Sequence, residues 1–201
     1  MTAVFLDYAS IDQHDLDFSE LHAVFEILTL YSASTEEQVL ARLQEVDVVI
    51  TNKVRISAEV IQQLPKLKLI LISATGTNNV DLVQAKKSGI VVCNCQAYGT
   101  SAVAQHTLML MLALSTSVIQ YHQAVQKGEW QKAQQFCLLD FPIVELAGKT
   151  LGIIGYGELG QAVAQLAKAF GMQIMVGALP NRPQREGRVQ LDVLLSQADY
   201  V

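Results

Sequence analysis

Three glycines in this sequence have the spacing of a site that binds the diphosphate of a dinucleotide. Gly155, Gly157 and Gly160 form the pattern G-x-G-x-x-G within the segment IIGYGELG. In such a turn the first glycine allows a sharp change of direction, the second lets phosphate approach the backbone, and the third lets helix and strand pack closely. The amides of Glu158 and Leu159 would begin the following helix, where unpaired N–H groups and the helix dipole attract an anion. The pattern indicates a dinucleotide site.

The second strand of this unit, expected at residues 173–177, lacks the acid that often follows it. A carboxylate there would bind both ribose hydroxyls and repel a 2′-phosphate, but the position holds Ala178. Asn181 and Arg182 follow, with two more arginines downstream. Because a guanidinium can pair with a 2′-phosphate, we expect NADP, or either of NAD and NADP, as the coenzyme. The alternative is a solvated basic loop that contacts no ligand.

The elements that must position these groups alternate between strand and helix. Apolar runs at residues 4–6, 46–51, 69–72 and 90–93 alternate with helical patterns at 35–45, 58–64 and 80–88. This order predicts an α/β fold with parallel sheets. A long helix is expected from a cap at Ser101 to about residue 117, with Val103, Thr107, Leu110 and Leu114 on one stripe. We place a domain boundary at this helix, which gives domains of residues 1–98 and 99–201.

The composition limits the classes of function. Half of the 201 residues are apolar and the net charge is −5, so the chain is globular and has no basic surface for nucleic acid or an anionic membrane. No apolar run reaches the roughly 20 residues of a membrane span. The cysteines at 93, 95 and 137 lack metal or redox spacing and are interpreted as small apolar residues in a reducing cytoplasm. We expect no metal site and a cytoplasmic location.

Four stretches of the chain resemble the D-isomer-specific 2-hydroxyacid dehydrogenases, especially the members that act on hydroxypyruvate or glyoxylate. They are ATGTNNVD (74–81), YGTSAVAQHTLMLMLAL (98–114), QFCLLDFPIVE (135–145) and ELAGKTLGIIGYGELGQAVAQLAKAFGM (145–172). The resemblance covers nearly the whole chain. It implies a flavodoxin-like substrate domain followed by a Rossmann-type NAD(P)-binding domain, which this chain would contain only in part.

The resemblance also implies binding roles for individual residues. In the family, backbone amides of one loop after a strand bind the substrate carboxylate, and free amides at such a place can hold an anion. The substrate-binding residues would be Thr75, Gly76 and Thr77 in that loop, with Asn52 and Lys53 at the end of another strand. Thr107 matches a position that reaches toward the cofactor, although it can equally be a packing residue. Lys53 can equally be an ordinary solvated side chain at the end of a strand.

A partner is implied in the same way. The segment from about 117 to 145 matches the arm through which relatives form dimers, so a homodimer is expected. Trp130 and Phe136 would then be anchors at the interface, because large aromatic side chains dominate binding energy there. The alternative for both residues is packing within the chain.

The implied reaction is hydride transfer between NAD(P)H and a small 2-oxo acid such as hydroxypyruvate or glyoxylate. In the family an arginine holds the carboxylate, and a histidine tuned by a glutamate protonates the alkoxide. We find no residue of this chain that matches these three catalytic groups. The chain ends where we expect the third Rossmann strand to begin, so we expect the sequence to belong to a longer protein.

The local histidines do not replace the missing acid. His14, His22, His106 and His122 have no paired acid and no metal spacing.

Two alternatives to the dehydrogenase remain. One is a non-catalytic module of the same fold that senses dinucleotide or binds a partner. The other is a methyltransferase that uses S-adenosylmethionine, which Ala178 disfavours because such enzymes place an acid there.

Overall fold

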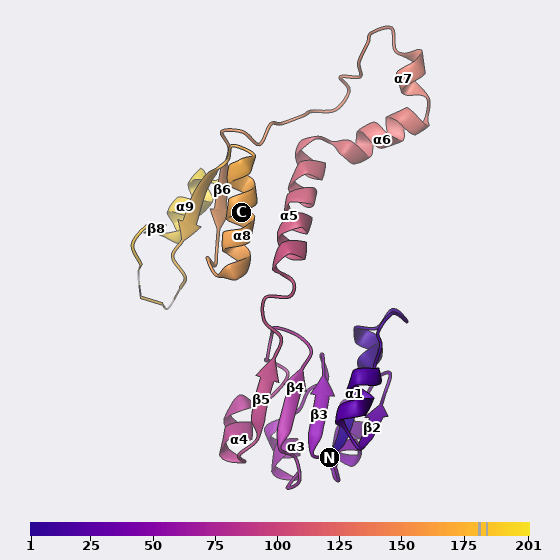
Figure 1. Cartoon of the computed structure of the whole chain (residues 1–201). Helices are drawn as coiled ribbons and strands as arrows, with labels where there is room; N and C mark the ends of the chain where they lie inside the picture. Colours follow the sequence, from indigo (N-terminus) through magenta and orange to yellow (C-terminus); the bar gives the residue numbers. More distant parts are fainter. Residues whose placement is uncertain (181, 184) are drawn as a thin grey trace. The chain divides into compact units, whose positions relative to one another are not determined.

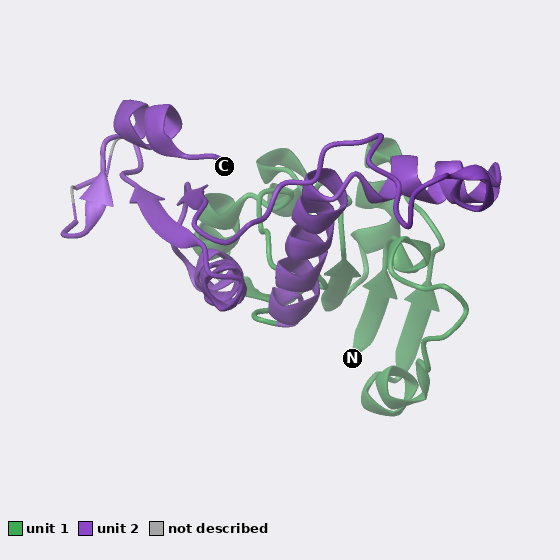
Figure 2. Ribbon diagram, turned by 90° about the horizontal axis from the view of Figure 1, so that it is seen from above, with its two compact units in different colours: residues 1–97 green, residues 98–201 purple. Residues whose placement is uncertain are grey.

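The computed structural model describes residues 1–180, 182–183 and 185–201. The chain forms two compact units, Met1–Ala97 and Tyr98–Val201 (Figures 1 and 2). Each unit is an α/β structure with parallel strands, as the sequence predicts. The two units are described separately below.

Unit 1 contains a five-stranded parallel sheet in the order β2-β1-β3-β4-β5, the flavodoxin-like order. The strands are β1 (Thr2–Phe5), β2 (Ile27–Leu30), β3 (Val48–Thr51), β4 (Leu69–Ile72) and β5 (Val91–Asn94). In the register of β3 and β4, Thr51 is opposite Ile72. The two strands therefore end side by side, and the loops after them leave the same edge of the sheet.

Helices cover both faces of this sheet. They are the 3-10 helix η1 (Tyr8–Ser10), α1 (Ser19–Val24), α2 (Glu36–Leu43), α3 (Ala58–Gln62) and α4 (Leu82–Lys87). Because successive strand residues point to opposite faces, Val4 packs into the cluster that contains Val39 of α2, whereas Phe5 packs against Phe25 after α1. β2 is absent from the predicted apolar runs because it is a partly exposed strand at the edge of the sheet.

Unit 2 contains a sheet in the order β6-β7-β8, formed by β6 (Thr150–Ile153), β7 (Gln173–Gly177) and β8 (Arg188–Val189). Tyr200 pairs in parallel with Leu151 on the free side of β6. The expectation that the third Rossmann strand begins at the last residue is therefore wrong. β8 is the third strand and Tyr200 occupies the fourth position, which gives the Rossmann order 3-2-1-4. The two-residue length and arginine content of β8 hid it from an apolar pattern.

Asp199 fixes this fourth position beside β6. Its carboxylate accepts a hydrogen bond from the amide of Thr150 at 2.8 Å, and its own amide donates to the Thr150 carbonyl at 2.9 Å. The Thr150 amide, with a further contribution from Lys149, lowers the pKa of the Asp199 carboxyl below its usual value. The carboxylate is thus held ionised where the chain turns back into the sheet.

The helices of unit 2 are α5 (Thr100–Ser115), α6 (Val118–Gln126), α7 (Glu129–Lys132), α8 (Glu158–Ala169) and α9 (Leu191–Gln197). α5 and α8 pack together on one face of the sheet, where Leu108 and Ala164 lie in one cluster with Ile153. Leu194 of α9 is fully buried on the other face. A Cβ at Gly152 would lie 2.6 Å from Leu194 Cδ2, so this glycine lets α9 approach β6.

Two expectations about α5 are wrong. The helix is capped by Gly99 rather than Ser101, which lies in the first turn. The predicted stripe is not buried either: Val103, Leu110 and Leu114 are exposed, and the buried positions are Ala104, Leu108, Met111 and Ser115. The helix is apolar on most of its surface, so periodicity does not identify the packed face. In the described part of the chain no single helix could cross a membrane, although α5 and α6, bent by 62°, pass the length and composition test as a pair.

Candidate functional site

The glycine turn connects β6 to α8 as the sequence predicts. Gly155 has φ +103°, a conformation that side-chain-bearing residues rarely adopt. A Cβ at Gly160 would lie 2.2 Å from the carbonyl oxygen of Gly155, so a larger residue there would force the helix away from the turn. A Cβ at Gly157 would meet nothing within 4 Å. The space in front of Gly157 is therefore open to a ligand.

The start of α8 presents unpaired amides to this space. Gly157 is the N-cap and carries no side chain to cap the helix, and Gln161 is the first residue whose amide bonds back to it, at 2.9 Å. Among the described residues no hydrogen bond is donated by the amides of Glu158, Leu159 and Gly160. The first amides of a helix together with its dipole form an anion site. The geometry fits a diphosphate.

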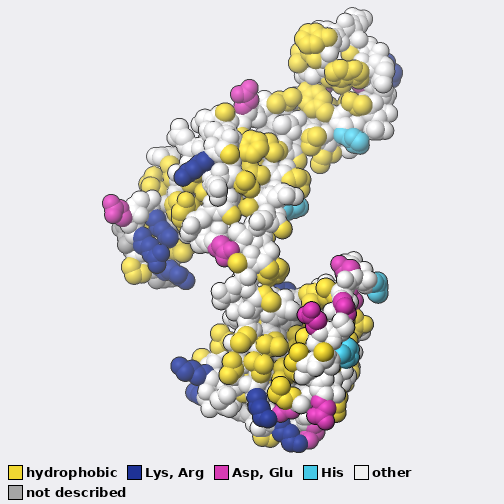
Figure 3. Space-filling model, viewed as in Figure 1, with side chains coloured by type: hydrophobic (Ala, Val, Ile, Leu, Met, Phe, Trp, Pro, Cys, Tyr) yellow, Lys and Arg dark blue, Asp and Glu magenta, His cyan; other side chains and the backbone are white. Residues whose placement is uncertain are grey.

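The loop after β7 lies at the same edge of the sheet as this turn. Ala178 is half-buried, and its amide donates to the Val189 carbonyl at 2.7 Å, which joins the loop to β8. Arg182 is exposed, and its amide contacts the Leu179 carbonyl at 3.4 Å. Basic side chains gather near β8 (Figure 3). Asn181, the other residue predicted to bind the cofactor here, lies outside the described residues.

A second set of unpaired amides lies in unit 1, in the loop between β4 and α4. Thr75 and Gly76 are exposed and Thr77 is half-buried. In the part of the chain that the structure describes, the amides of these three residues donate no hydrogen bond. The loop is held from the neighbouring strand, because the side-chain amide of Asn94 donates to the Thr75 carbonyl at 2.7 Å. Such a loop can bind a small carboxylate.

The loop after β3 is held by a carboxylate that the sequence analysis missed. Asp7 is 6% exposed and accepts hydrogen bonds from the amides of Asn52 at 2.8 Å and Lys53 at 2.7 Å. The side chain of Asn52 is buried and donates to Ser10 Oγ, so this residue supports the loop, while the Lys53 side chain is exposed. Asp7 and Asn94 share a signal that could have identified them, since each is a polar residue at the carboxyl end of a strand.

Thr107, the cysteines and the histidines make no hydrogen bond to either glycine-turn or Thr75-loop residues in the described part of the chain. The Thr107 hydroxyl donates to the Val103 carbonyl one turn earlier in α5, at 2.8 Å. The cysteines are free thiols, and Cys93 and Cys95 are exposed. All four histidines are exposed. No group of three or more His, Cys, Asp and Glu residues that could hold a metal ion occurs among the described residues.

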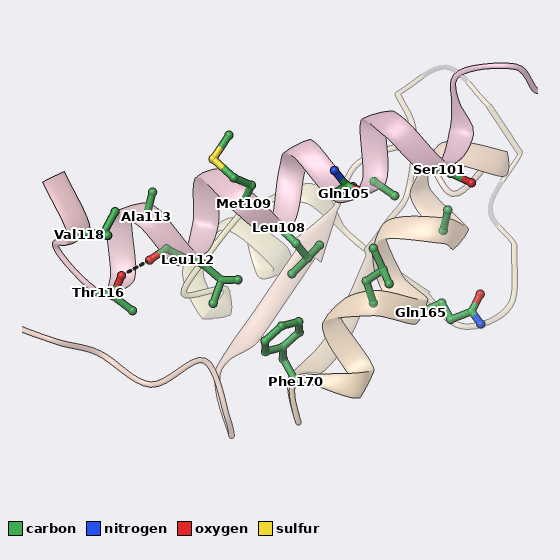
Figure 4. A pocket seen from close by; sticks show the side chains of 13 residues that line it. Ser101, Gln105, Leu108, Met109, Leu112, Ala113, Thr116, Val118, Gln165 and Phe170 are labelled. Carbon is green, nitrogen blue, oxygen red and sulfur yellow. Dashed lines mark hydrogen bonds between the residues drawn. The ribbon is translucent and has the colours of Figure 1, made fainter. Parts of the chain in front are cut away.

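The segment after α5 exposes large apolar side chains. Phe136 is 92% exposed and Trp130 is 52% exposed, so the Phe136 ring has almost no intrachain packing and the Trp130 ring is only partly covered. Tyr121 anchors the segment, because its hydroxyl lies 2.7 Å from the Phe141 carbonyl. An apolar groove of about 790 Å³ lies between α5 and α8 in the same unit. Leu108, Leu112 and Phe170 line it (Figure 4).

The fold is that of an α/β protein with a flavodoxin-like unit and a Rossmann-type unit, each with a candidate anion site. A sequence model of the D-isomer specific 2-hydroxyacid dehydrogenase, catalytic domain, matches residues 4–181. A glycerate dehydrogenase of Methylorubrum extorquens is 41% identical over 198 residues, which are 98% of this chain and 61% of that protein. The chain belongs to the D-isomer-specific 2-hydroxyacid dehydrogenase family and spans about three fifths of this relative's length.

Solved structures agree with this assignment. An acyclic imino acid reductase (Bsp5) in complex with NADPH and D-Arg matches with a TM-score of 0.81 and 25% identity, over 99% of this chain and 63% of that one. A D-lactate dehydrogenase from Aquifex aeolicus, complexed with NAD and lactic acid, matches with a TM-score of 0.80 and 28% identity, over 98% and 59% of the two chains.

Two alanine substitutions in the glycine turn should separate binding from folding. Gly157→Ala places a methyl group in open space on extended backbone, so we expect unchanged stability and a loss of dinucleotide affinity of about tenfold or more, because the methyl blocks close approach of phosphate. Gly160→Ala should lower the free energy of unfolding by about 1–3 kcal/mol, as overpacked sites do. Thermal melts and calorimetric titration with NADPH measure the two effects. Equal stability losses in the two variants would contradict the geometry.

Proposed function

We propose that the protein is an oxidoreductase that transfers hydride between a nicotinamide dinucleotide and a small 2-hydroxy or 2-oxo acid. The single observation that carries the proposal is the set of unpaired amides at Glu158, Leu159 and Gly160 facing open space at Gly157. Membership of the dehydrogenase family and the coenzyme complexes of two similar structures support it. Bound there, the coenzyme would supply the hydride.

The residues of this chain bind and orient the reactants in this proposal. The amides at the start of α8 hold the diphosphate, and the amides of Thr75, Gly76 and Thr77 hold the substrate carboxylate. Asn94 and Asp7 keep the two loops of unit 1 in position for that task. A substrate with a carboxylate next to a carbonyl would suit this loop. Hydroxypyruvate, the 2-oxo acid that corresponds to glycerate, and glyoxylate are both of this kind. We assign the proton transfer to no described residue.

NADP is the coenzyme that we propose this protein prefers. Two features support the preference: Ala178 removes the carboxylate that would repel a 2′-phosphate, and Arg182 stands exposed a few residues further on. A guanidinium binds phosphate in two parallel hydrogen bonds, so one well-placed arginine is enough for discrimination.

We also propose that the protein forms a homodimer through the segment 117–145. The exposed rings of Phe136 and Trp130 and the exposed apolar side chains along α5 support this proposal, because exposed apolar surface often marks a protein–protein interface. Yellow side chains cover much of the segment and of α5 in Figure 3. An apolar core of this kind is typical of obligate dimers.

The activity is tested by adding hydroxypyruvate or glyoxylate to the protein with NADPH or NADH and following the loss of coenzyme absorbance. We expect turnover with at least one acid, and faster turnover with NADPH. Tight coenzyme binding without turnover of either acid would support the non-catalytic module instead. The absence of both binding and turnover would rule out the proposal.

Coenzyme preference is tested by two substitutions with opposite effects. Arg182→Ala should raise the Michaelis constant for NADPH by about tenfold, because a charge-assisted hydrogen bond is lost, and should leave that for NADH almost unchanged. Ala178→Asp should raise the constant for NADPH and lower it for NADH, because the carboxylate binds the ribose hydroxyls. Equal effects of Arg182→Ala on the two coenzymes would contradict pairing with the 2′-phosphate.

Dimerisation is tested by sedimentation of the protein and of Phe136→Glu. The substitution places a charge on a side chain that makes almost no intrachain contact, so it should weaken the dimer by about tenfold or more and leave the melting temperature of the units unchanged. Gln134→Glu adds the same charge in the same segment without removing an apolar group, and should remain dimeric. A monomeric unsubstituted protein at micromolar concentration would refute the proposal.

A further inference from the structure

An acidic residue stands next to the place where the phosphates of a dinucleotide would bind. Glu158 is the first residue of α8, adjacent to Gly157, and its side chain is exposed. Its Oε1 accepts a hydrogen bond of 2.6 Å from the hydroxyl of Thr100, the first residue of α5. The contact joins the first turns of two helices that are 58 residues apart in sequence.

A carboxylate at this position has opposite effects on the empty and the occupied site. In the empty site it is favoured, because the N-terminus of a helix carries partial positive charge. A bound diphosphate would bring negative charge to the same N-terminus, close to this carboxylate. The carboxylate and the diphosphate compete for the same helix dipole and repel each other. This repulsion is strongest at low ionic strength.

Thr100 determines where this charge lies. α5 and α8 are packed together along the apolar cluster that contains Leu108 and Ala164, so the Thr100 hydroxyl is presented to the start of α8 by a fixed neighbour. Its hydrogen bond draws the carboxylate toward α5. The space in front of Gly157 is open, so we expect the long Glu158 side chain to reach it once the hydroxyl is removed.

We propose that Glu158 is an internal competitor that weakens coenzyme binding, and that Thr100 is a positioning residue that holds its carboxylate aside from the phosphate seat. This inference rests on the proposed function, because it assumes that the diphosphate binds at the glycine turn. It adds a residue pair that sets coenzyme affinity through charge.

The pair has a direct consequence for affinity. Replacing the carboxylate by an amide of the same shape should tighten binding of any ligand with two linked phosphates, whether or not it carries nicotinamide. Removing the Thr100 hydroxyl should weaken binding only while residue 158 carries a charge. A structural role of Thr100 in α5 would weaken binding whatever residue 158 is.

The test is a double-mutant cycle with calorimetric titration of the intact protein by ADP and by NADPH. We expect Glu158→Gln to bind ADP about tenfold more tightly at low salt, and the gain to shrink to less than about threefold at high salt, where charges are screened. Thr100→Val should weaken binding about threefold in the Glu158 protein and have no effect in the Glu158→Gln protein. Thr100→Ser, which keeps the hydroxyl, should bind ADP as tightly as the unsubstituted protein does.

Several results would overturn the inference. Equal or weaker ADP binding by Glu158→Gln at low salt would remove the competition. The same loss from Thr100→Val in both backgrounds would make Thr100 a structural residue. These outcomes leave the proposed function intact, because the coenzyme still binds. If no form of the protein binds ADP or NADPH, the phosphate seat itself is wrong, and the inference and the proposed function both fail.

Discussion

Unpaired backbone amides at the start of α8 are the constraint on which the rest of the site depends. They exist because Gly157, the N-cap, has no side chain to satisfy them. They point into open space because Gly155 turns the chain sharply after β6 and Gly160 lets the helix pack against that turn. The helix is held in this position by α5 on one side and by the sheet. A rigid set of donors of this kind binds phosphate without first having to rearrange.

Both units present free backbone amides in the same physical arrangement. In each one a parallel sheet ends in loops that lead into helices, and the free amides lie at the carboxyl ends of the strands. In unit 2 the amides are part of a long helix and suit a diphosphate. In unit 1 they lie in the short loop Thr75–Thr77, braced by Asn94, and suit a single carboxylate. In the proposed scheme backbone amides bind both anions, and the buried carboxylate of Asp7 holds the neighbouring loop at Asn52 and Lys53 in place.

The sequence predicted the parts of the structure that depend on local chemistry. The glycine turn and the strands β3, β4, β6 and β7 follow from residue types at fixed spacing, whereas the binding role of the loop at Thr75 was implied only by the family resemblance. The errors arise where tertiary contacts decide. Which face of α5 is buried depends on its packing with α8, and all its faces are apolar enough to be buried. β8 is two residues long and exists because it pairs with β7, with Val176 opposite Arg188 and Gly177 opposite Val189. The role of Asp7 depends on Asn52 and Lys53, which are 45 and 46 residues away in sequence.

The central claim is that the amides of α8 hold the coenzyme diphosphate, and amide NMR tests it most directly. ADP is added to the ¹⁵N-labelled protein, and the N–H resonances are followed through the titration. We predict that the largest shifts occur at Gly157, Glu158, Leu159 and Gly160, with smaller ones in the loop after β7. Saturable ADP binding that leaves these four resonances unmoved, or no binding at all, would contradict the account.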